Sequence, residues 1–259
     1  MSSENICIWC SGPATDKDLE HIFPEALGCP AHLTLPGTVV CRRCNTGLAH
    51  LDQGVADEFD VLAWMNNIRR KRGRAPEISN RGNTFGNIGK HGPQISFNLE
   101  RHAVTAHDGR RLAPYRGNLR DIRPKFERDG SIVKSSFEVP FGQGKKFVRG
   151  MTKIALGALA FLCGADLARR PQFDCVRQFV RFGGDKRYIL VAKTEDGLFK
   201  LSAESHFMEP DGDYCIEARI ANISFLIDLS HSQKFIPVVQ AKALETHGTD
   251  GWTTLPTAG

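Results

Sequence analysis

Two CxxC pairs near the start of the chain, Cys7 with Cys10 and Cys41 with Cys44, carry the clearest chemistry. Thiolates are soft ligands, and each CxxC turn places two sulfurs on one side of a tetrahedron. Because four cysteines leave no open coordination position, the pattern predicts a structural zinc site that crosslinks a segment too short to build its own core. An iron–sulfur cluster and a set of unrelated buried cysteines are the alternatives.

A second group of polar residues, suited to different chemistry, lies between and just after the cysteine pairs. The stretch LEHIFPEALG contains Glu20 and His21, and Asn45 directly follows Cys44. Histidine is the side chain whose ordinary pKa suits a general base near neutral pH. A carboxylate supplies a hard oxygen ligand for Mg²⁺ or Mn²⁺, and a carboxamide supplies a second. We expect the zinc site to bring Asn45, at the start of a helix, close to Glu20 and His21.

The order of EHIFPEALG and CRRCN resembles the HNH endonucleases of the His-Me finger (ββα-metal) superfamily, and is closest to the type with a CxxC…CxxC zinc site. The match covers Cys7–Asp52, roughly a fifth of the chain. The resemblance implies a zinc-stapled ββα-metal module, in which a β-hairpin packs on a helix. It also implies one catalytic divalent metal, Mg²⁺ or Mn²⁺, beneath the scissile phosphate.

The resemblance also assigns roles to individual residues. His21 is expected to be the general base that activates water, and Glu20 and Asn45 are expected to be ligands of the catalytic metal. That metal stabilises the charge that develops at the phosphate. His50 is a further candidate ligand, with a surface histidine as the alternative. The family has a middle motif residue, Asn or His, that orients the base, and His32 is the only side chain here in a comparable place.

Downstream of the motif, apolar residues at helical spacing predict a helix over 55–74 that ends in a basic cluster. This cluster is expected either to contact nucleic-acid phosphates or to be a solvated linker, and consists of Arg69, Arg70, Lys71, Arg72 and Arg74. A segment rich in Gly, Asn and Pro follows it. We therefore predict an HNH module at 1–75, a linker at 76–94 and a second domain at 95–259.

The second domain is predicted to be α+β, with an antiparallel sheet and a core helix. The core helix is expected over 147–169, a second helix over 172–179, and a hairpin at the DGLF sequence, residues 196–199. Basic residues near the start of the core helix either contact phosphates or are solvated: Lys145, Lys146, Arg149 and Lys153.

Composition limits the class of protein. The longest apolar run, Ile154–Ala165, has twelve residues, whereas a membrane span needs about 20. No basic segment followed by an apolar run opens the chain, so we expect no signal peptide and no membrane partner. The cysteine usage fits a reducing compartment, and we expect a cytoplasmic protein.

Residues 1–60 contain three Lys or Arg against nine Asp or Glu, and the remainder contains 31 against 20. A basic body suits a polyanionic partner.

These observations favour a metal-dependent HNH endonuclease that hydrolyses DNA phosphodiester bonds in restriction, phage defence or a mobile element. RNA is the alternative substrate, and both a monomer and a homodimer are compatible with the sequence. The competing interpretation is a non-catalytic zinc-finger protein that binds nucleic acid, in which EHIFP is only a turn. A third interpretation is an enzyme that has lost cleavage, because the middle motif residue has no clear counterpart.

Overall fold

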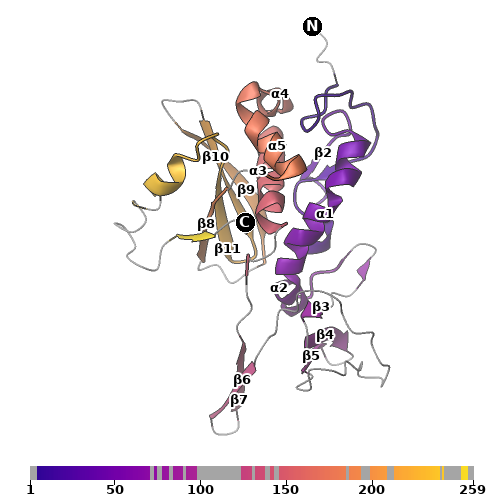
Figure 1. Cartoon of the computed structure of the whole chain (residues 1–259). Helices are drawn as coiled ribbons and strands as arrows, with labels where there is room; N and C mark the ends of the chain where they lie inside the picture. Colours follow the sequence, from indigo (N-terminus) through magenta and orange to yellow (C-terminus); the bar gives the residue numbers. More distant parts are fainter. Residues whose placement is uncertain are drawn as a thin grey trace. The chain divides into compact units, whose positions relative to one another are not determined.

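The structure is a computed structural model of mixed α+β class (Figure 1), in which every pair of described strands is antiparallel, as predicted. It describes residues 5–70, 73–74, 78–81, 84–89, 92–97, 124–129, 132–137, 141–142, 146–184, 187–193, 199–208, 213–239, 241 and 252–255. None of the helices in this part of the chain combines the length and the apolar composition that a bilayer span requires.

The chain divides into two compact units that do not follow the order of the sequence. Unit 1 consists of Met1–Ala56 together with Gly142–Gly259, and unit 2 consists of Asp57–Phe141. The cysteine-rich segment and the C-terminal sheet therefore belong to one unit, and unit 2 is inserted between them. This division differs from the one at residues 75 and 94 suggested by composition, which stays a prediction.

The N-terminal part of unit 1 is a short hairpin followed by a long helix. Its elements are β1 (Glu20–His21), η1 (Glu25–Leu27), β2 (Thr34–Leu35) and α1 (Arg42–Glu58). Gly28 ends η1 in the left-handed region at φ 74°, a conformation that glycine adopts without strain. Helix α1 begins at Arg42, whose backbone N–H donates to Asp16 Oδ2 at 2.7 Å, so a distant carboxylate caps the helix. The prediction that Asn45 lies at a helix start is confirmed.

The C-terminal part of unit 1 begins with helices. They are α3 (Phe147–Cys163), α4 (Ala165–Ala168), η3 (Pro171–Phe173) and α5 (Asp174–Phe182). The predicted continuous helix over 147–169 is wrong in one respect, because Gly164 adopts φ 98° and ψ 144° and separates α3 from α4. The second predicted helix is confirmed as α5, displaced toward the C-terminus.

A five-stranded sheet completes unit 1, with strand order β12-β8-β11-β10-β9. The strands are β8 (Ile189–Lys193), β9 (Leu201–Met208), β10 (Asp213–Ile220), β11 (Ile223–Asp228) and β12 (Thr253–Leu255). The predicted hairpin between β8 and β9 is wrong: β8 pairs with β11 and β12, and β9 pairs with β10. The tight turn at Ala221, with φ 58°, joins β10 to β11 instead, and β11 then separates β8 from β10.

Helix α3 lies between the sheet and α1, as Figure 1 shows. On the sheet side, the Phe147 ring packs edge-on against Phe225 with centroids 5.9 Å apart. On the other side α1 approaches very closely at Gly150. A Cβ atom at this position would lie 2.4 Å from Val55 Cγ2 and 2.8 Å from Leu51 O. Only glycine permits this distance between the two helices.

In its described residues, unit 2 contains one short helix and two small sheets. Its elements are α2 (Asp60–Met65), β3 (Ile78–Arg81), β4 (Thr84–Gly89), β5 (Gly92–Phe97), β6 (Pro124–Asp129) and β7 (Ile132–Phe137). Strands β3, β4 and β5 form one sheet, and β6 and β7 form a hairpin. The predicted helix over 55–74 is confirmed only in part, because residues 55–58 end α1 and residues 60–65 form α2. Phe59 leaves the helical conformation at ψ 6°, and Asn67, at φ 50°, follows the end of α2.

The close approach of α1 and α3 predicts opposite effects for two substitutions in α3. Gly150→Ala should destabilise the protein by about 1–3 kcal/mol, because the new methyl group meets backbone that cannot move aside. Gly157→Ala should be neutral or stabilising by up to about 1 kcal/mol, because its nearest neighbour is Leu35 Cδ1 at 4.0 Å and alanine favours the helix. Urea denaturation of both variants tests this, and equal midpoints would contradict the packing.

Candidate metal centre and the residues around it

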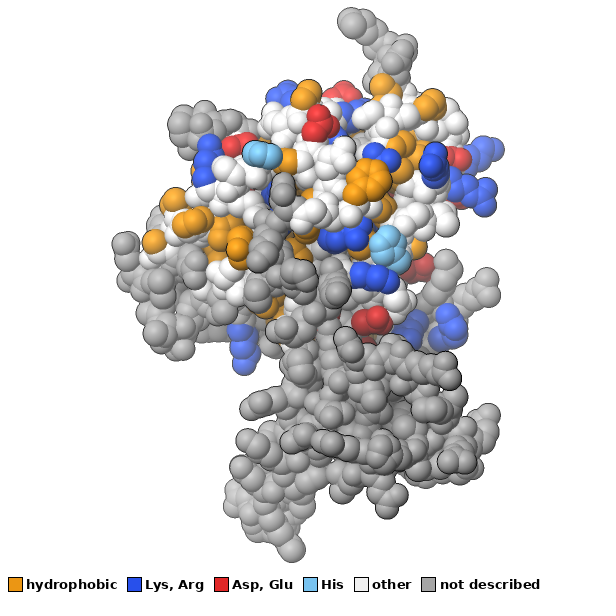
Figure 2. Space-filling model, in the orientation of Figure 1, with side chains coloured by type: hydrophobic (Ala, Val, Ile, Leu, Met, Phe, Trp, Pro, Cys, Tyr) orange, Lys and Arg blue, Asp and Glu red, His pale blue; other side chains and the backbone are white. Residues whose placement is uncertain are grey.

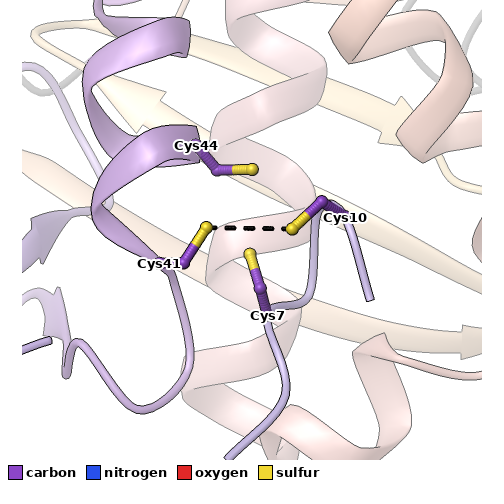
Figure 3. A group of neighbouring side chains, drawn as sticks. All are labelled: Cys7, Cys10, Cys41 and Cys44. Carbon is purple, nitrogen blue, oxygen red and sulfur yellow. Dashed lines mark hydrogen bonds between the residues drawn. The ribbon is translucent and has the colours of Figure 1, made fainter. Parts of the chain in front are cut away.

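The sulfur atoms of the four paired cysteines converge on one point, as Figure 3 shows. All four lie within 4.8 Å of one another, and Cys10 Sγ is 3.7 Å from Cys41 Sγ. A tetrahedral zinc ion with Zn–S bonds of about 2.3 Å holds its sulfurs about 3.8 Å apart. The donors therefore fit a Zn(Cys)₄ centre in number, chemistry and spacing, and the prediction that these cysteines come together as one group that could hold a metal ion is confirmed.

Backbone hydrogen bonds shape the two halves of this centre. In the first half, Cys7 N–H donates to Gly12 O at 2.8 Å, and Trp9 N–H points to Cys7 Sγ at 3.4 Å. In the second half, the N–H groups of Cys44 and Asn45 both donate to Cys41 O at 3.0 Å. Ile8 N–H donates to Val39 O at 2.9 Å and holds the halves together. Backbone hydrogen bonds thus fix the positions of the four cysteines (the cysteine cage), and a bound metal ion would crosslink them.

The proximity of the four thiols changes their acidity. The hydrogen bond with Cys44 lowers the pKa of Cys7 to about 4, although burial acts in the opposite direction. The same hydrogen bond, together with burial, raises the pKa of Cys44. The cluster therefore concentrates negative charge on buried sulfur, which is the charge that a bound zinc ion would neutralise.

The cage brings Asn45 to the strand that contains Glu20 and His21. The Asn45 side-chain amide donates from Nδ2 to Leu19 O at 3.1 Å, across 26 positions of sequence. Strand β1 is held in turn by β2, with His21 opposite Thr34. The predicted neighbourhood of Asn45 and the Glu-His pair is therefore present in the structure.

The carboxylate of Glu20 points into the interior and meets a buried lysine. Its Oε1 atom lies 2.6 Å from Lys153 Nζ, and the same ammonium lies 2.7 Å and 2.8 Å from the two oxygens of Asp52. The exposed fractions of the side chains are 2% for Lys153, 7% for Glu20 and 27% for Asp52. One lysine from α3 thus joins a carboxylate of β1 to a carboxylate of α1.

The acidity of these groups reflects both burial and pairing. Burial alone lowers the pKa of Lys153, but Asp52 and Glu20 more than offset it, so that this pKa lies above its ordinary value. Burial raises the pKa of Glu20, and Lys153 offsets this only in part. The ammonium therefore stays charged, and Glu20 depends on it to remain ionised inside the protein.

The expected catalytic metal site, with Glu20 and Asn45 as ligands, stays a prediction. Among the residues described, the four cysteines are the one group of three or more His, Cys, Asp or Glu side chains close enough to share an ion. Glu20 is occupied by Lys153, and its assignment as a metal ligand stays a prediction. His50 is exposed, and its Nδ1 lies 2.9 Å from Gly47 O within its own helix.

The other predicted residues belong to unit 2, lie on the surface of unit 1 or fall outside the described part of the chain. Arg69, Arg70 and Arg74 belong to unit 2, and Lys71 and Arg72 fall outside the described residues. His32 is exposed.

Lys153 is the residue whose role the sequence analysis missed. It was expected to reach phosphate or solvent, but it is buried. A lone lysine inside the apolar run MTKIALGALAF is the signal that could have shown this, because a buried ammonium requires carboxylate partners.

A small cavity, of the size of one water molecule, lies beside this ion pair. It is lined by Trp9, Glu20, His21, Ile22, Leu35, Lys153 and Gly157. Trp9 Nε1 is buried here and forms no hydrogen bond with any described residue, whereas the buried Glu20 Oε1 is paired with Lys153. The protein interior between the four cysteines and α3 is therefore polar at this cavity.

Comparison with known protein families, with curated proteins and with solved structures finds no match to this chain.

The thiolate cage predicts that zinc is required for the folding of unit 1. Cys44→Ser should abolish zinc binding and lower the melting temperature by several degrees, because a small segment loses its crosslink. Zinc content by atomic absorption and thermal unfolding measure the two effects. The exposed Cys163 offers the matched control, and Cys163→Ser should leave both unchanged. A Cys44→Ser protein with full zinc content and wild-type melting would exclude the cage.

The buried ion pair predicts a large cost for removing its cation. Lys153→Met keeps most of the side-chain volume but leaves the Glu20 and Asp52 carboxylates uncompensated, which should destabilise the protein by about 3 kcal/mol or more. Lys17→Met removes an exposed lysine and should change stability by less than about 0.5 kcal/mol. Urea midpoints compare the two, and similar values would show that Lys153 is not buried as described.

Proposed function

We propose that this protein is an endonuclease of the HNH type that hydrolyses DNA phosphodiester bonds. The observation that carries the proposal is the hydrogen bond from Asn45 Nδ2 to the carbonyl oxygen of Leu19, the residue directly before β1. The resemblance assigns function to Asn45 and the Glu20–His21 pair, although 24 positions or more separate them in the sequence. An antiparallel hairpin followed by a helix, stapled by four cysteines, supports the same assignment.

In this proposal His21 is the general base. Its ring is partly exposed and forms no hydrogen bond or ion pair with the residues described, so it is open to solvent and substrate. The neutral imidazole accepts a proton from water as the water oxygen attacks phosphorus, the bond from phosphorus to the 3′-oxygen breaks, and the 3′-oxygen takes up a proton from solvent to become a hydroxyl group. Asn45 holds β1 in place through Leu19.

The requirement for Mg²⁺ or Mn²⁺ rests on the resemblance. The Glu20 carboxylate, which would be the principal ligand, is paired with Lys153. This arrangement does not fit a carboxylate-bound metal, and the steps above rest on the protein side chains alone. Metal dependence is therefore an outcome for experiment to decide.

Charge supports DNA as the partner in a general way. Residues 61–259 contain the excess of Lys and Arg, and on the face shown in Figure 2 these side chains are spread among acidic and apolar ones. Such a distribution favours contacts to the phosphate backbone over base reading.

A second candidate is a zinc-stapled protein that binds nucleic acid without cleaving it. The observation that favours it is again the Glu20–Lys153 pair, because a carboxylate committed to packing is lost to catalysis. This candidate predicts DNA binding that weakens with salt, together with no cleavage under any metal condition.

The decisive experiment is cleavage of supercoiled plasmid with Mg²⁺, Mn²⁺ or EDTA. Removal of the base in His21→Ala should reduce nicking by about 10²–10⁴-fold. The exposed histidine of a distant loop provides the control, and His231→Ala should retain full activity. Binding of labelled DNA is measured in parallel. Binding without cleavage by the wild type would favour the second candidate, and equal cleavage by His21→Ala would remove His21 from the mechanism.

A further inference from the structure

Strand β9 forms one edge of the five-stranded sheet and carries an unusually exposed set of side chains. It pairs with β10 in one uninterrupted antiparallel register from Leu201–Ile220 to Met208–Asp213. None of its eight residues is buried, whereas four residues of β10 are. Among the described residues no strand pairs with the other edge of β9. The strand contains no proline or glycine, so its free N–H and C=O groups can accept another strand.

The two faces of β9 differ in chemistry. Ala203, Ser205 and Phe207 lie on the face toward α3, since Cys163 Sγ at the end of α3 contacts Ser205 Oγ at 3.3 Å. Glu204 and His206 lie on the opposite face and are exposed. The two groups alternate along the strand, because successive side chains of a β-strand point to opposite faces.

The carboxylate of Glu204 is in an unfavourable position within one chain. Its direct cross-strand neighbour on β10 is Glu217, a residue of the same charge. Glu217 accepts a hydrogen bond from Ser224 Oγ at 2.6 Å and lies 3.7 Å from His206 Nε2. Glu204 has no hydrogen-bond or ion-pair partner among the described residues.

We propose that β9 pairs antiparallel with β9 of a second copy of this chain, about a two-fold axis at Ser205. The register follows from two constraints. Directly opposite residues of paired strands must lie on the same face, which restricts the axis to a residue rather than a peptide bond. An axis at Glu204 would oppose two carboxylates, and an axis at His206 would oppose two imidazoles. The axis at Ser205 places Glu204 opposite His206 of the partner subunit, twice by symmetry.

The same register also covers apolar surface on the other face. It places Phe207, which is 53% exposed, opposite the small Ala203 of the partner subunit. Phe161 and Leu162, the residues before Cys163 in α3, are 40% and 42% exposed. Their helix end lies above the centre of the interface, because Cys163 contacts Ser205. The interface therefore combines a continuous ten-stranded sheet with an apolar contact between the two α3 ends.

Sedimentation velocity of the full-length protein over a range of concentrations tests this dimer. The wild type should associate reversibly. Glu204→Lys should weaken association about tenfold or more, because each subunit then opposes lysine to His206 of the partner subunit. The double variant E204K/H206E restores opposite charges in the same register and should recover association. Lys193→Glu changes the charge of an exposed residue on β8 and should have no effect.

The proposal requires all of these results. A wild type that stays monomeric at every concentration overturns it, as does a dimer that Glu204→Lys leaves intact. Failure of E204K/H206E to recover association, in a protein that melts like the wild type, overturns the register at Ser205. The dimer is independent of the proposed nuclease activity, since neither the cleavage assay nor His21 enters its test.

Discussion

The contact of Lys153 with Glu20 and Asp52 is the interaction on which the arrangement of unit 1 depends. A charged lysine inside a protein requires carboxylates at hydrogen-bonding distance, since burial without them would cost several kcal/mol. The three residues come from α3, β1 and α1, and their pairing fixes the positions of all three elements. The glycine contact at Gly150 and the bond from Arg169 Nε to Ile6 O, at 2.8 Å, join the same parts of the chain.

The Lys153 ion pair and the cysteine cage together position β1. The cage ties the N-terminal segment to the first turn of α1, and the ion pair ties the hairpin to the helix that carries the sheet. Adjacent residues of a strand point to opposite faces. Glu20 is therefore directed inward for packing, while His21, the next residue, is left partly exposed. In the proposed enzyme, one residue of the pair stabilises the structure and the other performs the chemistry.

The five-stranded sheet has different neighbours on its two faces. Its α3 face is covered by the helix, and its other face holds a small apolar cluster made by Leu190, Cys215, Leu226, Phe235 and Ile236. Both faces of the sheet therefore pack against other parts of unit 1, and among the described strands none pairs with the outer edge of β9. A two-fold axis there would place two copies of His21 in one assembly, which suits an enzyme that acts on two strands.

The sequence by itself determined the features that depend on local spacing. The cysteine pairs predicted a single metal-binding group, and the alternating apolar runs predicted an antiparallel α+β domain, because a turn or a strand needs only its own residues. The tertiary structure alone decided which strands pair, that α3 joins the cage to the sheet, and that Glu20 faces a buried Lys153. The last of these facts depends on residues more than a hundred positions apart. Contacts between distant residues produce no periodic pattern in the sequence. One lysine in an apolar run does not identify the carboxylates with which it pairs.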